Sequence, residues 1–147
     1  MRAFCDGPKV VLKARHPSST LARPVKPKKI LVVDDSDLMQ RLYGVMLRGG
    51  GLVGARDGEE ALAKIVADPE IDLVLLDINM PKMNGFEVLR ELGARGLVPA
   101  LRVIVVTTEG RDEDAQRGLA AGAAAYLTKP FRADEVRAAI EALPEPS

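Results

Sequence analysis

The chain has 147 residues, a length that fits one domain and allows a buried core without disulfides. Its formal net charge at pH 7 is zero, but residues 1–29 hold eight Lys/Arg and one Asp (+7), whereas the remainder holds thirteen Lys/Arg and twenty Asp/Glu (−7). Cys5 is the only cysteine, so an internal disulfide is excluded. No apolar run approaches the ~18 residues of a membrane span, and a secretory signal is missing. We therefore expect a cytoplasmic protein without membrane contact.

The N-terminal segment, residues 1–27, is predicted to be a basic, disordered tail, and residues 28–147 are predicted to form the globular domain. The tail holds four prolines among its cations, and its apolar patch is Val10-Val11-Leu12. Such a segment buries too little apolar surface to offset the entropy that it would lose on ordering. A basic arm that binds nucleic acid or a partner is the alternative. Aromatic residues spaced for base stacking are missing, so we expect no nucleic-acid partner.

From Lys29 onward, short apolar runs alternate with segments of helical periodicity. Short runs rich in β-branched residues are typical of strands that are buried on both faces of a parallel sheet. The predicted strands cover residues 30–33, 52–55, 72–76, 101–106 and 124–127. The predicted helices cover residues 36–48, 59–67, 86–92, 112–121 and 134–143. In the first helix, one face carries Leu38, Leu42, Val45 and Met46.

Five strands that alternate with five helices predict an α/β fold. Right-handed crossovers place the helices on both faces of a doubly wound parallel sheet. In sheets of this kind, ligands bind beyond the carboxyl ends of the strands. We therefore expect the chemistry of this chain to lie just after its first, third, fourth and fifth predicted strands.

Acidic residues follow two of these strands. Asp34 and Asp35 come after the first strand, and Asp77 comes after the third. Like charges that meet at one edge of a sheet need a compensating cation, and carboxylate oxygens are ligands that Mg²⁺ prefers. A zinc site is not indicated, because His16 and Cys5 both lie in the predicted tail. The sequence therefore predicts a magnesium site.

A hydroxyl and a cation follow the remaining two strands, as Thr107 and Lys129. Phosphoryl transfer needs a nucleophile, positioning and neutralised phosphoryl oxygens, and the Asp77 carboxylate is a suitable nucleophile. Each residue also has a simpler explanation: Asp35 as a helix cap, Thr107 as a strand-end hydroxyl and Lys129 as a surface cation. Their common position at the carboxyl ends of the strands favours one shared site.

Several motifs together resemble the receiver domain of two-component signalling proteins. The resemblance covers about residues 28–143. Its motifs are LVVDDS at 31–36, LDINMP at 76–81, Asn84-Gly85, Val106-Thr107 and YLTKPF at 126–131. The resemblance implies a flavodoxin-like, five-stranded parallel sheet of strand order 2-1-3-4-5 with five helices.

The resemblance also implies a role for each site residue. Asp77 matches the phosphoacceptor, and Asp35, Asp77 and the backbone carbonyl of Asn79 match the direct protein ligands of Mg²⁺. Asp34 matches the acidic residue that reaches the metal through water. Asn79 and Glu109 match positions that tune dephosphorylation, and this pair implies a short-lived acyl phosphate.

Thr107 and Lys129 match the residues that contact the phosphoryl oxygens, and the Lys129–Pro130 bond matches a cis peptide. Tyr126 matches an aromatic switch that turns inward as Thr107 moves toward the phosphate. Thr108 departs from the small residue that is usual in the family, and we expect it to narrow the approach of the phosphodonor.

The implied function is a switch that a histidine kinase, or a histidine phosphotransfer protein, phosphorylates. Only four residues follow Leu143, so we expect no output domain and a chemotaxis-type output through the face of the fourth helix, fifth strand and fifth helix. We expect a monomer or a weak phosphorylation-dependent dimer, and no enzymatic activity beyond its own phosphorylation and dephosphorylation. The alternatives are a phosphorelay intermediate and a pseudo-receiver that only binds partners. A phosphatase with an Asp nucleophile is disfavoured, because Asn79 stands where its second carboxylate would be needed.

Overall fold

The computed structural model describes residues 10–12, 27–47, 51–78, 80, 84–98, 101–108 and 112–143. The strands are β1 (Val10–Leu12), β2 (Lys29–Val33), β3 (Gly51–Ala55), β4 (Leu73–Asp77), β5 (Arg102–Thr107) and β6 (Ala125–Thr128). The helices are α1 (Asp37–Met46), α2 (Gly58–Ala67), α3 (Gly85–Ala94), α4 (Asp112–Ala120) and α5 (Ala133–Glu141). Each predicted strand and helix is present, and its bounds lie within two residues of the predicted ones.

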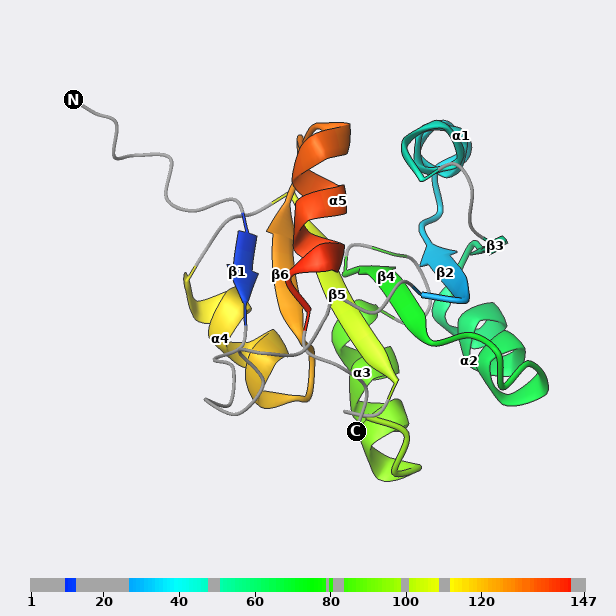
Figure 1. The fold of residues 1–147 in the computed structure, drawn as a ribbon. Coiled ribbons are helices and arrows are strands. Elements are labelled where there is room, and N and C mark those ends of the chain that lie inside the picture. The colour runs from blue at the N-terminus through cyan, green and yellow to red at the C-terminus, as the bar shows by residue number, and fades with distance from the viewer. Residues whose placement is uncertain are drawn as a thin grey trace.

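The strands form one sheet in the order β1-β6-β5-β4-β2-β3 (Figure 1). The strands from β2 to β6 are mutually parallel. Counted among themselves, these five strands have the order 2-1-3-4-5, so the predicted doubly wound α/β fold is confirmed. All five parallel strands direct their carboxyl ends to one edge of the sheet, which is where the predicted site residues follow them.

The sixth strand, β1, was not predicted. It pairs antiparallel with β6, so that Val10 lies opposite Leu127, Val11 opposite Tyr126 and Leu12 opposite Ala125. A run of three apolar residues is too short to show a periodicity, and its partner strand lies near the other end of the chain. The rest of the predicted tail, residues 1–9 and 13–26, lies outside the described residues.

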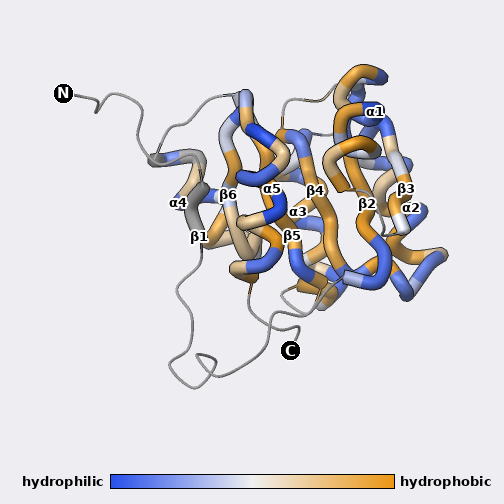
Figure 2. Tube along the Cα trace, turned by 45° about the horizontal axis from the view of Figure 1, so that its top comes forward, coloured by the Kyte–Doolittle hydropathy of each residue, from blue (hydrophilic) through white to orange (hydrophobic). Residues whose placement is uncertain are grey.

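Helices cover both faces of the parallel strands, which explains why these strands are apolar along their length (Figure 2). Successive side chains of a strand point to opposite faces. In β2, Leu31 and Val33 therefore pack into a core cluster with α2 and α3, whereas Ile30 and Val32 pack into a second cluster with α1 and α5. The central strands are fixed from both sides, and with them the edge at which the site lies.

The side chain of Gln40 on α1 joins the ends of two strands. Its amide Nε2 donates hydrogen bonds to the backbone carbonyls of Val32 at 3.2 Å, Asp34 at 3.0 Å and Ala55 at 3.0 Å. The same amide explains the glycine inside β3, because a Cβ atom at Gly54 would lie 2.6 Å from Gln40 Oε1. Gly54 is thus the residue that leaves space for this amide.

Replacing Gln40 with Leu is expected to lower the free energy of unfolding by about 2 kcal/mol. The variant keeps the bulk of the side chain but removes the amide donor from three carbonyls at the strand ends, of which that of Ala55 keeps its hydrogen bond from the Asp34 amide. Urea unfolding of the variant and the parent chain measures the effect. Arg41→Leu, on the exposed side of the same helix, is the control and should change stability by less than about 0.5 kcal/mol. Equal effects of the two substitutions would contradict the role of the amide.

Candidate functional site

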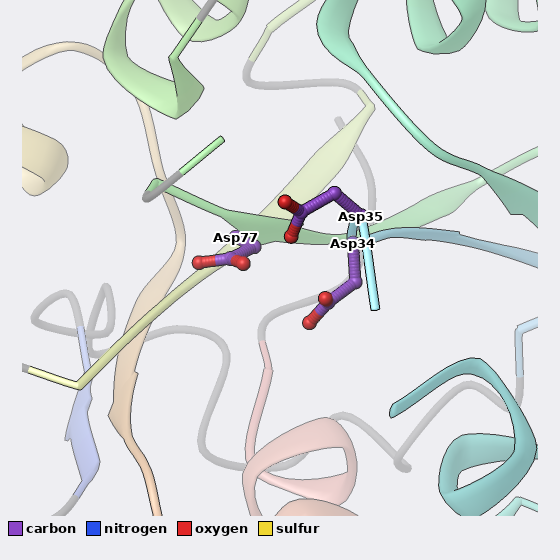
Figure 3. A group of neighbouring side chains, drawn as sticks. All are labelled: Asp34, Asp35 and Asp77. Carbon is purple, nitrogen blue, oxygen red and sulfur yellow. The ribbon is translucent and has the colours of Figure 1, made fainter. Parts of the chain in front are cut away.

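Three carboxylates meet at the carboxyl edge of the sheet (Figure 3). Asp34 and Asp35 follow β2, and Asp77 ends the adjacent parallel strand β4. Each contributes one oxygen to a group whose members all lie within 4.8 Å of one another. Asp34 and Asp77 are 1% and 5% exposed, whereas Asp35 is open to solvent. Two of the three carboxylates are therefore buried, and the third faces solvent.

The backbone around Asp34 is held from several directions. The Asp34 amide donates to the carbonyl of Ala55 at 3.0 Å, and the Asp34 carbonyl accepts from Gln40. Asp34 Oδ1 accepts a hydrogen bond from the backbone amide of Ser36 at 2.9 Å. Ser36 in turn caps α1, because its hydroxyl accepts from the amide of Met39. The turn that carries Asp34 and Asp35 is therefore built into both the sheet and α1.

Lys129 supplies the positive charge of the pocket. Its ammonium donates to Asp34 Oδ2 at 2.9 Å and lies 3.6 Å from Asp77 Oδ2, and its side chain is 16% exposed. The backbone amide of Lys129 donates to the carbonyl of Thr107 at 2.7 Å. The Lys129–Pro130 peptide is cis, as the resemblance implied. One cation thus faces two buried carboxylates, and their charges are only partly balanced.

Thr107 ends β5 and is 1% exposed. Thr107 lies opposite Thr128 of β6. The residue before it, Val106, lies opposite Asp77 of β4. The residue after it, Thr108, is exposed, and its effect on the phosphodonor stays a prediction. The fold therefore brings Thr107 to the same edge as the three carboxylates and the Lys129 ammonium.

Tyr126 lies deeper in the sheet, in register with Val105 of β5, and its side chain is 1% exposed. Its ring belongs to the core cluster on the α2 and α3 side of the sheet. The predicted site residues Asn79 and Glu109 lie outside the described residues.

Tyr43 of α1 is a neighbour of the pocket that was not predicted from the sequence. Its side chain is 1% exposed, and its ring centroid lies 5.8 Å from that of Phe131. Burial, followed by the negative charges of Asp34 and Asp77, raises the pKa of the Tyr43 hydroxyl far above its ordinary value. The hydroxyl is therefore protonated near neutral pH and adds no charge to the pocket.

Most of the helix face that was predicted to be apolar is not the buried face of α1. Leu38, Leu42 and Val45 are 65%, 37% and 60% exposed, whereas Met46 packs against the second core cluster and Tyr43 is buried. Helical spacing identifies an apolar stripe, but packing against the sheet decides which stripe is covered. The exposed stripe begins just after Asp35, beside the carboxylate pocket.

The donor set of the pocket suits a hard divalent cation. Carboxylate oxygens are preferred by Mg²⁺, which keeps part of its water shell and therefore needs a site with an open side. The exposed Asp35 beside buried Asp34 and Asp77 provides such a site. Among the described residues, Asp34, Asp35 and Asp77 are the one set of three or more Asp, Glu, His or Cys side chains that lie close enough together to bind the same ion.

The comparison with protein families matches residues 30–141 to the response regulator receiver domain. The chain belongs to this family. The match runs from the second residue of β2 to the end of α5 and includes all of the predicted site residues, and β1 lies outside it. Receiver domains are the phosphorylated modules of two-component response regulators, and the acidic pocket at the carboxyl edge is consistent with that role.

Relatives of this chain include transcriptional regulatory proteins. The chain is 38% identical to the alkaline phosphatase synthesis transcriptional regulatory protein PhoP of Bacillus subtilis over 79% of the chain and 48% of that protein. It is 41% identical to the transcriptional regulatory protein CpxR of Escherichia coli over 78% of the chain and 48% of that protein. The chain thus spans about half the length of these curated relatives.

Solved structures give the same fold. The chemotaxis protein CheY4 of Vibrio cholerae superposes with a TM-score of 0.74 at 32% identity, covering 80% of this chain and 99% of that chain. The receiver domain of Francisella response regulator 1452 superposes with a TM-score of 0.70 at 30% identity, covering 77% and 93%. In the described part of the receiver domain, none of the helices has the length and apolar character of a membrane span.

Proposed function

We propose that the chain is a phosphoryl-accepting signalling switch in which Asp77 receives a phosphoryl group from a partner histidine kinase or histidine phosphotransfer protein. The observation that carries the proposal is the buried Asp77 carboxylate, with Asp35 on one side and the Lys129 ammonium 3.6 Å away. Asp34, Asp35 and Asp77 would hold Mg²⁺ together with the carbonyl of Asn79. The proposal assigns the chain no catalytic activity on other substrates.

In the proposed reaction, a carboxylate oxygen of Asp77 attacks the phosphorus of a phosphohistidine. The new O–P bond gives an acyl phosphate, and the broken N–P bond leaves its electron pair on the histidine ring nitrogen. The Lys129 ammonium, held between Asp34 and Asp77, neutralises charge on the phosphoryl oxygens, and the Thr107 hydroxyl donates to one of them. When bound, Mg²⁺ supplies further neutralisation of the phosphoryl charge. Asn79 and Glu109 are proposed to keep the acyl phosphate short-lived.

The output is proposed to be a change in the face formed by α4, β6 and α5, centred on Tyr126. Tyr126 lies in register with Val105, two residues before Thr107 on the adjacent strand, so a shift of Thr107 reaches its surroundings. The similar proteins include transcriptional regulators and a chemotaxis protein, and the latter supports a chemotaxis output as a candidate. A phosphorelay role is an alternative candidate. A partner-binding module that works without phosphorylation is the remaining alternative.

The proposal is tested by incubating the full chain with acetyl phosphate and Mg²⁺ and measuring its mass. We expect one added phosphoryl group, and we expect beryllofluoride with Mg²⁺ to shift the NMR signals of residues around Asp77. Asp77→Asn is the control and should show neither effect. A parent chain that stays unmodified and unshifted under these conditions would contradict the phosphoacceptor role and favour the partner-binding module.

The exposed stripe on α1, which consists of Leu38, Leu42 and Val45, suits the kinase contact. A protein that carries a phosphohistidine has to bring it to Asp77, and α1 begins two residues after Asp35. Three exposed aliphatic side chains on successive turns of one helix offer the apolar contact that such docking requires. We therefore propose that the phosphodonor protein docks on this stripe.

Changing Leu38 and Val45 together to Ser is expected to slow phosphotransfer from a phosphohistidine protein by about tenfold or more, since apolar contact is removed without touching the pocket. Acetyl phosphate needs no docking surface, so its reaction should be unchanged. The measurement uses a phosphohistidine protein that phosphorylates the parent chain. Val66→Ser on α2, where the side chain is also 60% exposed, is the control. An equal loss with both donors would point to damage in the pocket instead.

A further inference from the structure

The outer edge of β6 is the part of the sheet that β1 covers. The amide of Lys129 donates to the carbonyl of Thr107 on β5, and strand amides alternate in direction. The Leu127 amide therefore points toward β5 as well, and the Tyr126 amide and carbonyl point toward the opposite edge. Val11 lies opposite Tyr126 at that edge. The backbone of Tyr126 thus faces β1.

The strand β1 lies on the face that is proposed for the effector. It pairs with β6 and also contacts α5 (Figure 1). Tyr126, at the centre of that face, is the residue opposite the middle of β1. Residues 10–12 lie outside the part of the chain that matches the receiver family. This cover is therefore an addition of this chain to the family fold.

The connection between β1 and β2 is long enough to let β1 dock and leave. Residues 13–28 separate the two strands, and sixteen residues span roughly 50 Å when extended. In the sheet, β1 is four strand positions away from β2, which is about 19 Å.

The pairing is also short. Three residues of β1 pair with β6, whereas β5 and β4 are paired over five residues. A strand of this length gains few hydrogen bonds for the backbone that it orders, so another extended segment can replace it. Antiparallel strand addition at an exposed sheet edge is a general mode of peptide recognition.

We propose that β1 is an intramolecular occupant of the β6 edge, so that the chain's own N-terminal segment competes with an effector for this surface. The competition with an effector rests on the proposed function, because it needs the face of α4, β6 and α5 to be the output face. The occupancy of the edge by residues 10–12 does not rest on it. An incoming partner would present an extended segment that pairs antiparallel with Tyr126.

The occupancy is tested by amide hydrogen exchange of the full chain, measured by NMR without any phosphodonor. Val11→Pro removes the backbone donor opposite Tyr126, and Val11→Thr keeps it. We expect the Tyr126 amide to exchange about tenfold faster in the Pro variant and at the parent rate in the Thr variant. Leu127, whose amide points toward β5, should be unaffected in both. A Tyr126 rate that is the same in the parent chain and both variants would overturn the proposal.

The competition is tested with a peptide of the chain's own sequence, Gly7 to Arg15 (GPKVVLKAR), as the external strand. We expect it to shift the NMR signals of residues 125–128 in the Val11→Pro chain at several-fold lower peptide concentration than in the parent chain. In the parent chain, β1 is covalently linked to the domain and therefore has a high effective concentration at the β6 edge. The same peptide with Pro at its central Val is the control. Equal shifts in the parent and variant chains would overturn the competition. A failure of Asp77 phosphorylation would leave both experiments unaffected.

Discussion

Gly85→Ala is expected to lower the free energy of unfolding by about 3 kcal/mol, the upper end for overpacking. A Cβ atom at Gly85 would lie 2.7 Å from the backbone oxygen of Asp77 and 2.7 Å from the Cα atom of Ile78. These are backbone atoms, which have no side-chain rotamer with which to move away. Relief requires a shift of α3 or of the segment after β4, and either shift displaces Asp77. The variant should therefore also react more slowly with acetyl phosphate.

The control for Gly85 is Gly44→Ala on α1. A Cβ atom there would meet nothing within 4 Å, and Gly44 is an exposed residue in the last turn of the helix. Alanine should therefore raise the stability by about 0.5–1 kcal/mol through helix propensity. Urea unfolding of the two variants should thus give changes of opposite sign. A Gly85→Ala chain as stable as the parent would show that α3 approaches Asp77 less closely than described.

Lys129→Met is expected to lower the free energy of unfolding, measured without Mg²⁺, by about 3 kcal/mol. The substitution preserves the length of the side chain but removes the ammonium that contacts Asp34 and Asp77. Asp34 is 1% exposed, so its carboxylate would be left buried without its cation. Arg95→Met is the control. It breaks the exposed ion pair with Glu91, which should contribute less than about 1 kcal/mol.

Mg²⁺ should reverse most of the loss in the Lys129→Met chain. The lysine and a divalent cation neutralise the same carboxylates, so removing the lysine should strengthen Mg²⁺ binding and increase its stabilising effect on the variant. A titration of the melting temperature against Mg²⁺ concentration measures this. A variant that Mg²⁺ stabilises no more than it stabilises the parent would contradict a shared site. Phosphorylation of the variant should remain slow, because the ammonium is also needed at the phosphoryl group.

The parallel sheet and the edge of its site could be predicted from the sequence because burial on both faces makes these strands uniformly apolar. The carboxyl end of each such strand is then marked by a polar residue, such as Asp34, Asp77 or Thr107. In a parallel sheet these ends share one edge, so order along the chain is enough to bring the residues together. The order of the five strands within the sheet did not follow from this pattern, and was implied by the resemblance to receiver domains.

Other features depend on contacts that periodicity does not encode. The helix α1 carries apolar residues on two sides, and the stripe of Leu38, Leu42 and Val45 is the exposed one. The strand β1 is only three residues long and pairs with a strand near the other end of the chain. The amide of Gln40 is recognisable only once the carbonyls of two strands are placed around it. The spacing of apolar residues along the chain does not indicate which side of α1 is buried, which strand β1 pairs with or which carbonyls Gln40 contacts.

Tyr43 gives the chain an optical property. The sequence contains no Trp, two Tyr and three Phe, so emission excited at wavelengths longer than phenylalanine absorbs comes from Tyr43 and Tyr126. Both rings are 1% exposed, and one lies in the electrostatic field of the acidic pocket while the other lies at the centre of the proposed output face. Unlabelled protein therefore has one fluorophore beside the site of the proposed input and one at the site of the proposed output. Replacing either tyrosine with Phe would separate their two signals.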